Sequence, residues 1–402
     1  MQGQIKIGLD VSGLDPSFKE HATRGIGRYV REISTGLAEK FSNANSDDSI
    51  HYGTFNHLSL APSHFLDSLF KSCPVGKQTL RQQIYYPYRL FRIKEFNVLH
   101  FPAQMDPPAF CPVPYIVSVM DLIPLVLADL YSAGRSTWRF TLARFLELKA
   151  IRRASLILSI SQTTADDLVN ILGISKKRII VTPLGVDEKF FHAQLKISEE
   201  ELRHKYNLPK DRPVILYVGG IDQRKNCEGM LKTLQQVKAE CLKEQIPLPI
   251  LVMAGKIQQD KQYPKLVELI SDFDLHNDVF MLGYVPDEDL LQIFKISTLF
   301  IFLSLYEGFG LPPLEAMASG LPVVSSNTSA MPEVLGESAL LVDPNNVDQS
   351  TKAVLDILKN KELAQKLSEA GEKQARHFSW QRTIDLTAEA YRNFGKVVNK
   401  RD

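Results

Sequence analysis

The stretch Leu299-Phe-Ile-Phe-Leu-Ser-Leu-Tyr-Glu-Gly-Phe-Gly-Leu-Pro-Pro-Leu-Glu315 predicts a strand, a glycine-bearing loop and a helix in immediate succession. It begins with an apolar run that is typical of a buried parallel strand. Pro312 and Pro313 suit the first turn of the helix. Gly308 and Gly310 let the backbone approach a ligand closely, and the free amides and dipole of the new helix attract an anion. The stretch therefore predicts an anion-binding cradle in an α/β protein.

The same alternation of apolar runs and helical patterns fills the rest of the chain, which is typical of doubly wound α/β domains with parallel sheets. The segment Val181-Thr-Pro-Leu-Gly-Val-Asp187 ends a strand in turn residues, and a charged helix follows at Ser198–Tyr206. We therefore expect two Rossmann-like domains, residues 1–187 and 205–380, that face a central cleft. The other expected strands are Ile5–Asp10, Asn97–Phe101, Tyr115–Met120, Leu156–Ser159, Val214–Val218, Ile250–Ala254, Val279–Leu282 and Pro322–Ser325.

Length and composition agree with a folded, two-domain protein. The chain has 402 residues, and its 22 glycines and 22 prolines are scattered rather than clustered. Its 4 cysteines form no C-x-x-C pair, which suits a reducing cytosol. The N-terminal segment Ile5–Asp10 lacks the layout of a signal peptide, and no apolar run approaches the roughly 20 residues that span a bilayer. We expect a cytoplasmic protein.

Charge is divided unevenly along the chain. The formal net charge of +1 argues against a nucleic-acid partner. Residues 1–187 hold 21 Lys and Arg against 16 Asp and Glu, or +5, whereas residues 188–402 hold 26 against 30, or −4. This asymmetry is either ordinary surface variation or a basic face turned toward anionic lipid or a phosphate-bearing acceptor.

Two glutamates, Glu307 and Glu315, flank the Gly-x-Gly turn. An isolated glutamate is more often a cap or a surface carboxylate, but this pair around a helix start is far more specific. We expect Glu315 in the first turn of the helix, where it can bind the hydroxyls of a ribose. With its continuation Ala316-Met-Ala-Ser-Gly-Leu-Pro-Val-Val-Ser-Ser-Asn-Thr-Ser-Ala-Met-Pro-Glu333, the segment resembles the signature of the retaining glycosyltransferase family 4, of GT-B fold. The match extends over nearly the whole chain.

This resemblance implies roles for the residues of the loop. Glu307 would contact the donor sugar, and Glu315 would bind the ribose of the nucleotide. It also implies that the C-terminal helix, residues 381–402, packs back on the first domain, which would be the acceptor side. Further donor contacts would come from Gly308, Phe309, Gly310 and Leu311.

The family also implies a basic pair that opens the second domain, and Arg224 and Lys225 follow the expected strand Val214–Val218. Two cations there would neutralise the departing diphosphate. In the commoner layout an arginine directly follows the first glycine, but that position is Gly220. Arg224 would then act from a different angle. The alternative for such a pair is a solvated helix end.

Glycine-bearing turns at other strand ends resemble further donor contacts of the family, although each alone is an ordinary βα turn. In the second domain these are Gly219, Gly255 with Lys256, and Tyr284 with Val285, the last four near the nucleotide base. In the first domain the segment Arg24-Gly-Ile-Gly-Arg-Tyr29 places Gly25 and Gly27 near the donor phosphate and acceptor. The segment is not a dinucleotide fingerprint, because Val30 stands where a third glycine or alanine belongs.

The first domain departs from the family at the reacting centre. Relatives often carry His-Asp where this chain has Met120 and Asp121, and a thioether cannot exchange a proton. Asp121 is either a catalytic residue or the acid of an Asx-type turn. His100 resembles a recurring family histidine on the acceptor side, with a hydrogen-bonded core histidine as the alternative.

Two basic aromatic stretches, Arg81–Lys94 and Arg135–Arg153, are either core aromatics beneath solvated arginines or a surface for peripheral membrane contact. A third segment, Asp287-Glu-Asp289, reads as a D-x-D metal motif, but acids in the first turn of a helix explain it better. We expect no metal and no cofactor apart from the substrate nucleotide sugar, GDP- or UDP-linked.

These features together favour retaining transfer of a sugar to a saccharide or lipid-linked saccharide acceptor, as in the synthesis of surface polysaccharides. Similarity around Ser304–Pro312 to mannosyltransferases favours GDP-mannose as the donor. A UDP-sugar-dependent transferase or a non-catalytic, transferase-like subunit is the alternative. A nicotinamide dehydrogenase shares the domain type but needs the complete glycine fingerprint that this chain lacks. We expect the enzyme in the cytoplasm, at the inner face of the membrane if it binds lipid.

Overall fold

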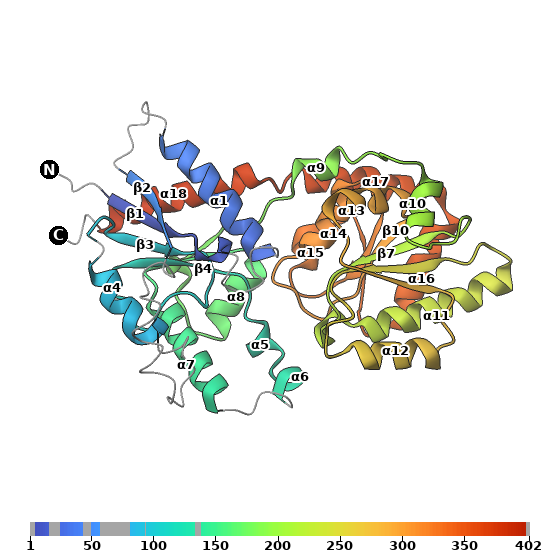
Figure 1. Cartoon of the computed structure of the whole chain (residues 1–402), viewed down its shortest axis with the longest axis horizontal. Helices are drawn as coiled ribbons and strands as arrows, with labels where there is room; N and C mark the ends of the chain where they lie inside the picture. The colour runs from blue at the N-terminus through green and yellow to red at the C-terminus, as the bar shows by residue number, and fades with distance from the viewer. Residues whose placement is uncertain are drawn as a thin grey trace. The chain divides into compact units, whose positions relative to one another are not determined.

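The computed structural model describes residues 5–15, 25–42, 50–56, 81–92, 94–132 and 138–398. The chain forms two compact units (Figure 1). Unit 1 comprises Met1–Gly185 together with Trp380–Asp402, and unit 2 comprises Val186–Ser379. The chain therefore passes between the units twice.

Unit 1 is built on a parallel sheet with the strand order β2-β1-β3-β4-β5-β6. Its central strands are buried along their whole length, as expected for a parallel sheet that is covered on both faces. The strands are β1 Ile5–Asp10, β2 Ile50–Phe55, β3 Val98–Phe101, β4 Tyr115–Val119, β5 Leu156–Ser159 and β6 Ile179–Val181.

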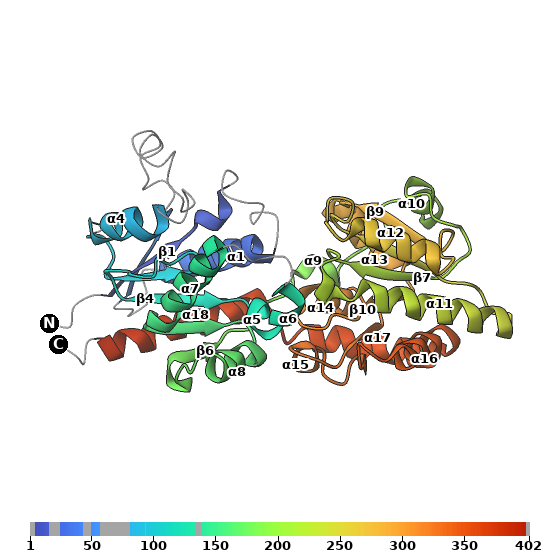
Figure 2. The same cartoon turned by 90° about the horizontal axis from the view of Figure 1, so that it is seen from below.

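Helices lie on both faces of this sheet. Alternate residues of the strands, such as Leu99 and Val117, pack in a core cluster with Leu90 and Ile151 of two helices. On the other face, α18 contacts α1 and β2, so the C-terminal helix belongs to unit 1 (Figure 2). The helices are α1 Gly25–Ser42, α4 Tyr86–Arg92, α5 Ile123–Val126, α6 Ala128–Ser132, α7 Trp138–Arg153, α8 Gln162–Asn170 and α18 Trp380–Val398, with short turns η1 Ser12–Leu14, η3 Arg81–Tyr85 and η4 Lys176–Arg178.

Unit 2 repeats the architecture with the strand order β12-β11-β10-β7-β8-β9. Phe300 of β10 pairs with Leu216 of β7 on one side and Val323 of β11 on the other. The strands are β7 Val214–Val218, β8 Ile250–Ala254, β9 Val279–Gly283, β10 Leu299–Phe302, β11 Val323–Ser326 and β12 Leu340–Val342. The helices are α9 Glu188–Phe191, α10 Glu199–Lys205, η5 Gln223–Lys225, α11 Cys227–Glu244, α12 Tyr263–Asp272, α13 Asp287–Ile296, α14 Leu311–Ala318, α15 Met331–Leu335, α16 Val347–Lys359 and α17 Lys361–Ala375.

The two chain ends of unit 2 lie side by side. The Val186 amide donates to the Phe378 carbonyl at 3.0 Å, and Val186 and Ser379 form an isolated parallel bridge. On the unit 1 side, the Thr383 hydroxyl donates to the Pro183 carbonyl at 2.6 Å. The two passages of the chain between the units are therefore hydrogen-bonded to each other on both sides.

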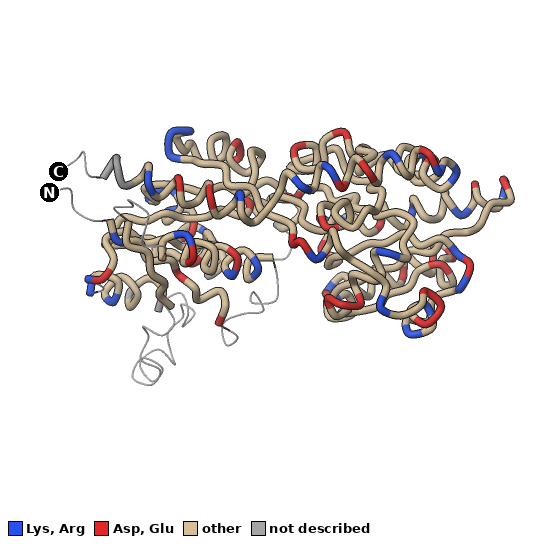
Figure 3. Tube along the Cα trace, turned by 90° about the horizontal axis from the view of Figure 1, so that it is seen from above, with Lys and Arg blue, Asp and Glu red and all other residues tan. Residues whose placement is uncertain are grey.

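These sheets confirm the predicted α/β fold of two Rossmann-like units. Each expected strand is present, with ends that shift by at most 2 residues. The sequence does not predict β2 and β12, which are edge strands and only partly buried. Both signs of charge occur in each unit (Figure 3). Among the described residues, no helix has the length and apolar character that a bilayer span requires.

Candidate functional site

The site lies where the strand order of unit 2 reverses. Strands β8 and β9 extend the sheet from one side of β7, and β10, β11 and β12 extend it from the other. Ligands of open parallel sheets bind outside the carboxyl ends of the strands at such a switch point. The loops that leave β7 and β10, residues 219–226 and 303–310, therefore form the first place to search.

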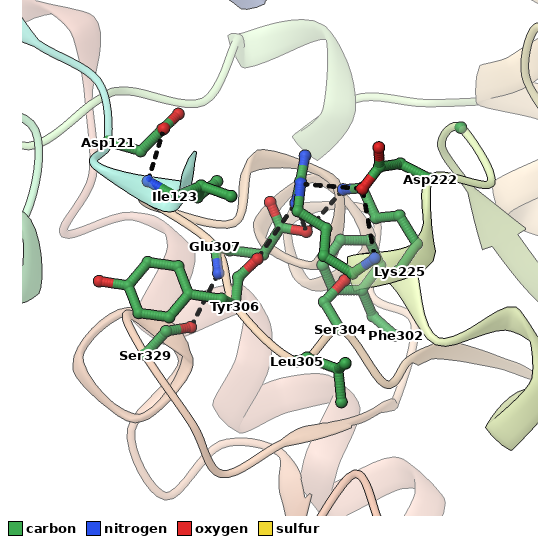
Figure 4. Close-up of polar contacts among 12 residues, drawn as sticks. Asp121, Ile123, Asp222, Lys225, Phe302, Ser304, Leu305, Tyr306, Glu307 and Ser329 are labelled. Atoms are coloured by element: carbon green, nitrogen blue, oxygen red, sulfur yellow. Dashed lines mark hydrogen bonds and ion pairs between the residues drawn. The ribbon is translucent and has the colours of Figure 1, made fainter. Parts of the chain in front are cut away.

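Glu307 is the centre of a buried ion cluster in this place (Figure 4). Its Oε1 atom lies 2.6 Å from Nζ of Lys225 and 2.5 Å from Nη1 of Arg224. The side chains of Glu307 and Lys225 are each only 11% exposed. Glu307 is thus brought together with Lys225, which lies 82 residues earlier in the sequence, and with the neighbouring Arg224. Arg224, which is 20% exposed, also pairs with the Asp222 carboxylate at 3.9 Å, so the two cations face two carboxylates.

Burial and neighbouring charges shift the ionisation of this cluster. Burial alone would raise the pKa of Glu307, but the Lys225 and Arg224 charges outweigh it and lower the pKa below the usual value. Burial lowers the pKa of Lys225, against the opposing effect of the Glu307 carboxylate. The Lys225 ammonium also lies 4.7 Å from the centre of the Phe302 ring, a cation–π contact. Glu307 is therefore held as a carboxylate between two cations.

The loop after β7 presents both cations by local capping. The Asp222 carboxylate accepts a hydrogen bond from the Arg224 amide at 3.2 Å and caps the short turn η5. Asn226 then takes a left-handed conformation, with φ of 52°, and caps α11 through the Gly229 amide. Asp222 is a supporting residue that the sequence analysis missed, although an aspartate two residues before a basic pair is a recognisable turn signal.

The loop after β10 turns sharply into α14. Gly310 has φ of 106°, a conformation that residues with a side chain rarely adopt, so the turn favours glycine. The helix begins at Leu311, which makes Glu315 its fifth residue. The prediction that Glu315 lies in the first turn was therefore wrong, because the helix starts two residues before Pro313. Glu315 is buried at 7% exposure and less affected by the helix dipole than expected.

The remaining donor candidates of unit 2 form a row beyond β7, β8 and β9. The Gly219 amide donates to the Ala254 carbonyl at 2.9 Å, and the Gly255 amide donates to the Gly283 carbonyl at 2.8 Å. A Cβ atom on Gly255 would meet the Gly219 carbonyl at 2.1 Å. Tyr284 is 67% exposed. Lys256 is also exposed, whereas Val285, Gly308, Phe309 and Leu311 are buried or half-buried.

The candidates of unit 1 have partners within their own unit. His100 is fully buried, and its ring nitrogens lie 2.7 Å from the Tyr391 hydroxyl and 2.8 Å from the Ser118 hydroxyl. Burial lowers the pKa of His100 to about 3, although Asp10 opposes this shift. Of the two alternatives that the sequence leaves for His100, the structure has the hydrogen-bonded core histidine. Its buried ring is not available to an acceptor in this structure.

Met120 and Asp121 lie in a braced turn after β4. The Met120 amide donates to Oε1 of Gln104 at 3.1 Å, and the Asp121 carboxylate accepts from the Ile123 amide at 3.1 Å. Asp121 thus makes the Asx-type turn that was the alternative to a catalytic role. Gly25 and Gly27 lie in the first turn of α1, and Gly27 is buried. Arg24 and Arg135, named in the predictions, fall outside the described residues.

The D-x-D segment has a structural explanation. Its three acids lie in the first turn of α13 and form ion pairs with lysines of the preceding chain. The pairs are Asp287 with Lys189 at 2.6 Å, Glu288 with Lys196 at 3.0 Å, and Asp289 with Lys205 at 2.6 Å. The segment therefore fastens residues 189–205 to α13. Over the part of the chain that the structure describes, no three His, Cys, Asp or Glu residues are grouped as metal ligands.

Comparison with known proteins assigns unit 2 to a family. Residues 198–374 match the family described as Glycosyl transferases group 1, and this match falls within Val186–Ser379. Unit 2 is therefore a group 1 glycosyltransferase domain. The two units together have the GT-B fold, which the structural neighbours share.

Two relatives from Escherichia coli are mannosyltransferases by name. Serotype-specific mannosyltransferase WbdA is 30% identical over 275 residues, which cover 67% of this chain and 32% of that protein. O-antigen chain mannosyltransferase B is 32% identical over 244 residues, which cover 61% of this chain and 62% of that protein. The chain thus spans less than two thirds of the length of either relative.

Solved structures share the fold along almost the whole chain. Sucrose-phosphate synthase from Thermosynechococcus elongatus superposes with a TM-score of 0.71 at 20% identity and covers 98% of this chain and 100% of its own. The Anabaena protein Alr3699/HepE, solved in complex with UDP and glucose, has a TM-score of 0.67 at 18% identity and covers 96% of this chain and 99% of its own. At these identities the likeness establishes the fold alone.

Proposed function

We propose that this protein is a retaining glycosyltransferase that transfers mannose from GDP-mannose to a saccharide or lipid-linked saccharide acceptor. The observation that carries the proposal is the Glu307 carboxylate held between Lys225 and Arg224 at the switch point of a glycosyltransferase domain. The names of the Escherichia coli relatives support mannose as the transferred sugar and surface polysaccharide as the product class.

The ion cluster suits the charge that develops during transfer. When the bond between the sugar and the diphosphate breaks, negative charge grows on the leaving oxygen, and Lys225 and Arg224 are placed to neutralise it. The Glu307 carboxylate accepts hydrogen bonds from sugar hydroxyls and orients the donor. Because these groups are already held by hydrogen bonds and ion pairs, little reorganisation is needed in the transition state.

Retention requires no carboxylate nucleophile in this scheme. The acceptor hydroxyl attacks the anomeric carbon from the face that the diphosphate leaves, and its proton passes to a diphosphate oxygen. One carbon–oxygen bond breaks and one forms, so the anomeric configuration is kept. Met120, in place of the family histidine, is compatible with this route because no protein base takes the proton.

The base of the nucleotide separates the two candidate donors, GDP-mannose and a UDP-sugar. The exposed ring of Tyr284 lies on the loop after β9, where a base would stack. A nucleotide at 100 times its Kd stabilises a protein by about 2.7 kcal/mol. Thermal unfolding with GDP and with UDP, followed by transfer assays with GDP-mannose and UDP-glucose, tests the choice. A response to UDP alone would replace GDP-mannose, and no response to either would overturn the donor site.

A lipid-linked acceptor would bring the enzyme to the cytoplasmic face of a membrane, and α7 presents a surface that suits this. Trp138, Leu142, Phe145, Lys149 and Arg152 recur at intervals of three and four residues and so share one face of the helix. Trp138 is 55% exposed and Phe145 is 58% exposed. Of the two alternatives that the sequence leaves open, this exposure supports a surface over core aromatics for this pair.

Charge favours an anionic lipid surface as the partner of this face. Helix α7 holds 5 Lys and Arg residues and 1 Glu, and α4 holds 2 Arg and no acid. Exposed aromatics beside cations suit the boundary between headgroups and acyl chains. Flotation with phosphatidylglycerol vesicles at low salt should therefore recover the protein. The double variant Trp138→Ser/Phe145→Ser should lose binding, whereas Leu242→Ser, at an exposed leucine of unit 2, should retain it. Equal recovery of all three would exclude this surface.

A further inference from the structure

The backbone of the loop Ser304–Glu307 is held from both sides. Strand β10 lies between β7 and β11, so the loop that follows it runs between the loops that follow its two neighbours. Each neighbour supplies hydrogen bonds to it. The anchoring concerns the main chain of the loop and is separate from the ion pairs of the Glu307 side chain.

On the β7 side, the partner is Arg224. The Leu305 amide donates to the Arg224 carbonyl at 2.7 Å. Nη1 of Arg224 also donates to the Tyr306 carbonyl at 3.1 Å. The same residue that pairs with the Glu307 carboxylate thus holds the two residues before it.

On the β11 side, the partners are Thr328 and Ser329, of which Figure 4 shows Ser329 beside Glu307. The Thr328 hydroxyl donates to the Leu305 carbonyl at 3.1 Å. The Glu307 amide donates to the Ser329 hydroxyl oxygen at 3.0 Å. Ser329 therefore fixes the main chain of Glu307, whereas Lys225 and Arg224 hold its side chain.

Ser329 takes a conformation that is costly for serine. Its φ is 53°, in the left-handed region, where glycine is favoured and asparagine and aspartate are tolerated. Within the described part of the chain, three of the other four non-glycine residues with positive φ are Asn207, Asn226 and Asp274, which follow this preference. A strained residue beside a functional group indicates that its side chain is needed there. In Ser329 that side chain is the hydroxyl that receives the Glu307 amide.

We propose that Ser329 is a positioning residue. By holding the Glu307 main chain, it places the Glu307 carboxylate where it can contact the donor sugar. This inference rests on the proposed function, because it assigns Glu307 to the sugar. A small displacement of Glu307 would weaken a contact that counts in the transition state, while the nucleotide diphosphate, which lacks the sugar, would bind as before.

The test replaces the serine in two ways. Ser329→Gly removes the hydroxyl and relieves the strained φ, whereas Ser329→Ala removes the hydroxyl and keeps the strain. We expect kcat to fall about three- to tenfold in both, the worth of one hydrogen bond. The melting temperature should be lower for Ser329→Ala than for Ser329→Gly. If kcat instead falls in Ser329→Ala but not in Ser329→Gly, in parallel with the melting temperature, the proposal is overturned.

A matched control comes from Gln245, a non-glycine residue at the C-terminal end of α11 with φ of 56°. Gln245→Gly relieves the same kind of strain away from Glu307, and it should leave kcat unchanged. Binding of GDP, measured by calorimetry, should be the same in all variants. Loss of kcat in Gln245→Gly would show that general backbone effects, and not the hydroxyl, control the rate.

Hydrogen exchange provides a readout that does not depend on transfer. The Glu307 amide should exchange faster in Ser329→Gly and Ser329→Ala than in the unaltered protein, because it loses its acceptor. Unchanged exchange would refute the hydrogen bond, and faster exchange with full kcat would refute the positioning role. If the unaltered protein transfers no sugar from any nucleotide donor, the proposed function fails, a result distinct from either of these.

Discussion

Each unit encloses a set of polar side chains, but the two sets differ in charge. In unit 1, His100, Ser118, Tyr29 and Tyr391 form a fully buried chain of neutral hydrogen bonds of 2.7 and 2.8 Å. In unit 2, the charged Glu307 lies between Lys225 and Arg224, and Arg224 also pairs with Asp222 at 3.9 Å. A satisfied neutral network stabilises a fold, whereas buried charged groups with shifted pKa values cluster at functional sites. The contrast supports a structural role for the neutral set and agrees with the site that we propose for the charged one.

The largest expected effect comes from breaking the charged cluster. Glu307→Ala and Lys225→Ala should each reduce transfer by at least about 100-fold, the scale of lost electrostatic stabilisation. The affinity for GDP should change in opposite directions in the two variants. Glu307→Ala leaves two cations for the diphosphate, so GDP binding should be kept or strengthened, whereas Lys225→Ala should weaken it.

Calorimetric titration of GDP and a transfer assay measure these outcomes, with circular dichroism as the check on folding. Glu307→Ala should also lower the free energy of unfolding, by about 3 kcal/mol, because it leaves buried charges without their partner. Parallel weakening of GDP binding in both variants would mean that Glu307 contributes to holding the nucleotide as well as the sugar.

An intermediate effect, on stability and without loss of rate, is expected from the neutral network. His100→Leu leaves the buried Tyr391 hydroxyl without its hydrogen-bond partner, which costs about 1–3 kcal/mol, whereas Ser118 keeps its hydrogen bond to Tyr29. Urea unfolding should show this loss, and the double variant His100→Leu/Tyr391→Phe should recover part of it. A strong fall in kcat with unchanged stability would instead return His100 to the acceptor side.

Because of His100, the free energy of unfolding should also depend on pH. The pKa of His100 is lowered from 6.5 to about 3 in the folded protein, so the unfolded chain binds the extra proton first as the pH falls. Stability from this group is present above pH 6.5 and is lost on acidification toward pH 3. Between pH 7 and pH 5 the unaltered protein should lose about 2 kcal/mol more than His100→Leu. Equal losses in urea unfolding would show that His100 is not buried in its neutral form.

The smallest effect is expected at Met120. A thioether takes no proton, and the Met120 backbone is held by Gln104 independently of its side chain. Met120→Ala should therefore reduce kcat by less than about tenfold, chiefly through lost packing at a residue that is 7% exposed. A loss as large as that of Lys225→Ala would give the thioether a direct role in the reaction.

The sequence predicts the central strands well because their burial on both faces leaves continuous apolar runs. The edge strand Ile50–Phe55 escapes prediction because only its ends are buried and polar residues lie between them. Arg224 and Lys225 are foreseeable from their place after β7, since ligands gather at strand ends. Arg224 and Lys225 contact Glu307 only because β10 lies beside β7 in the sheet. The family resemblance implies this strand order, whereas the local pattern of residues does not.

Other parts of the site are set by conformation that residue types do not reveal. Serine is not a residue that signals positive φ, so nothing in the sequence marks Ser329 as strained. The position of Glu315 depends on where α14 begins, and helix ends are the least certain part of such a prediction. For His100 the sequence leaves two alternatives, because a polar residue in an apolar strand is either buried with partners or turned to a ligand.

The hydrogen bond between Val186 and Phe378 has a consequence for how the protein can be rebuilt. Unit 2 is a continuous segment whose two ends are neighbours, whereas unit 1 is assembled from two separate pieces of chain. Unit 2 can be described as an insert within unit 1, and we expect that a related unit of different specificity, joined to the chain at the same two points, would fold in its place. Unit 2 is thus a single continuous segment, and unit 1 is the scaffold that receives it. This organisation would allow one half of the transferase to be replaced while the other half is kept.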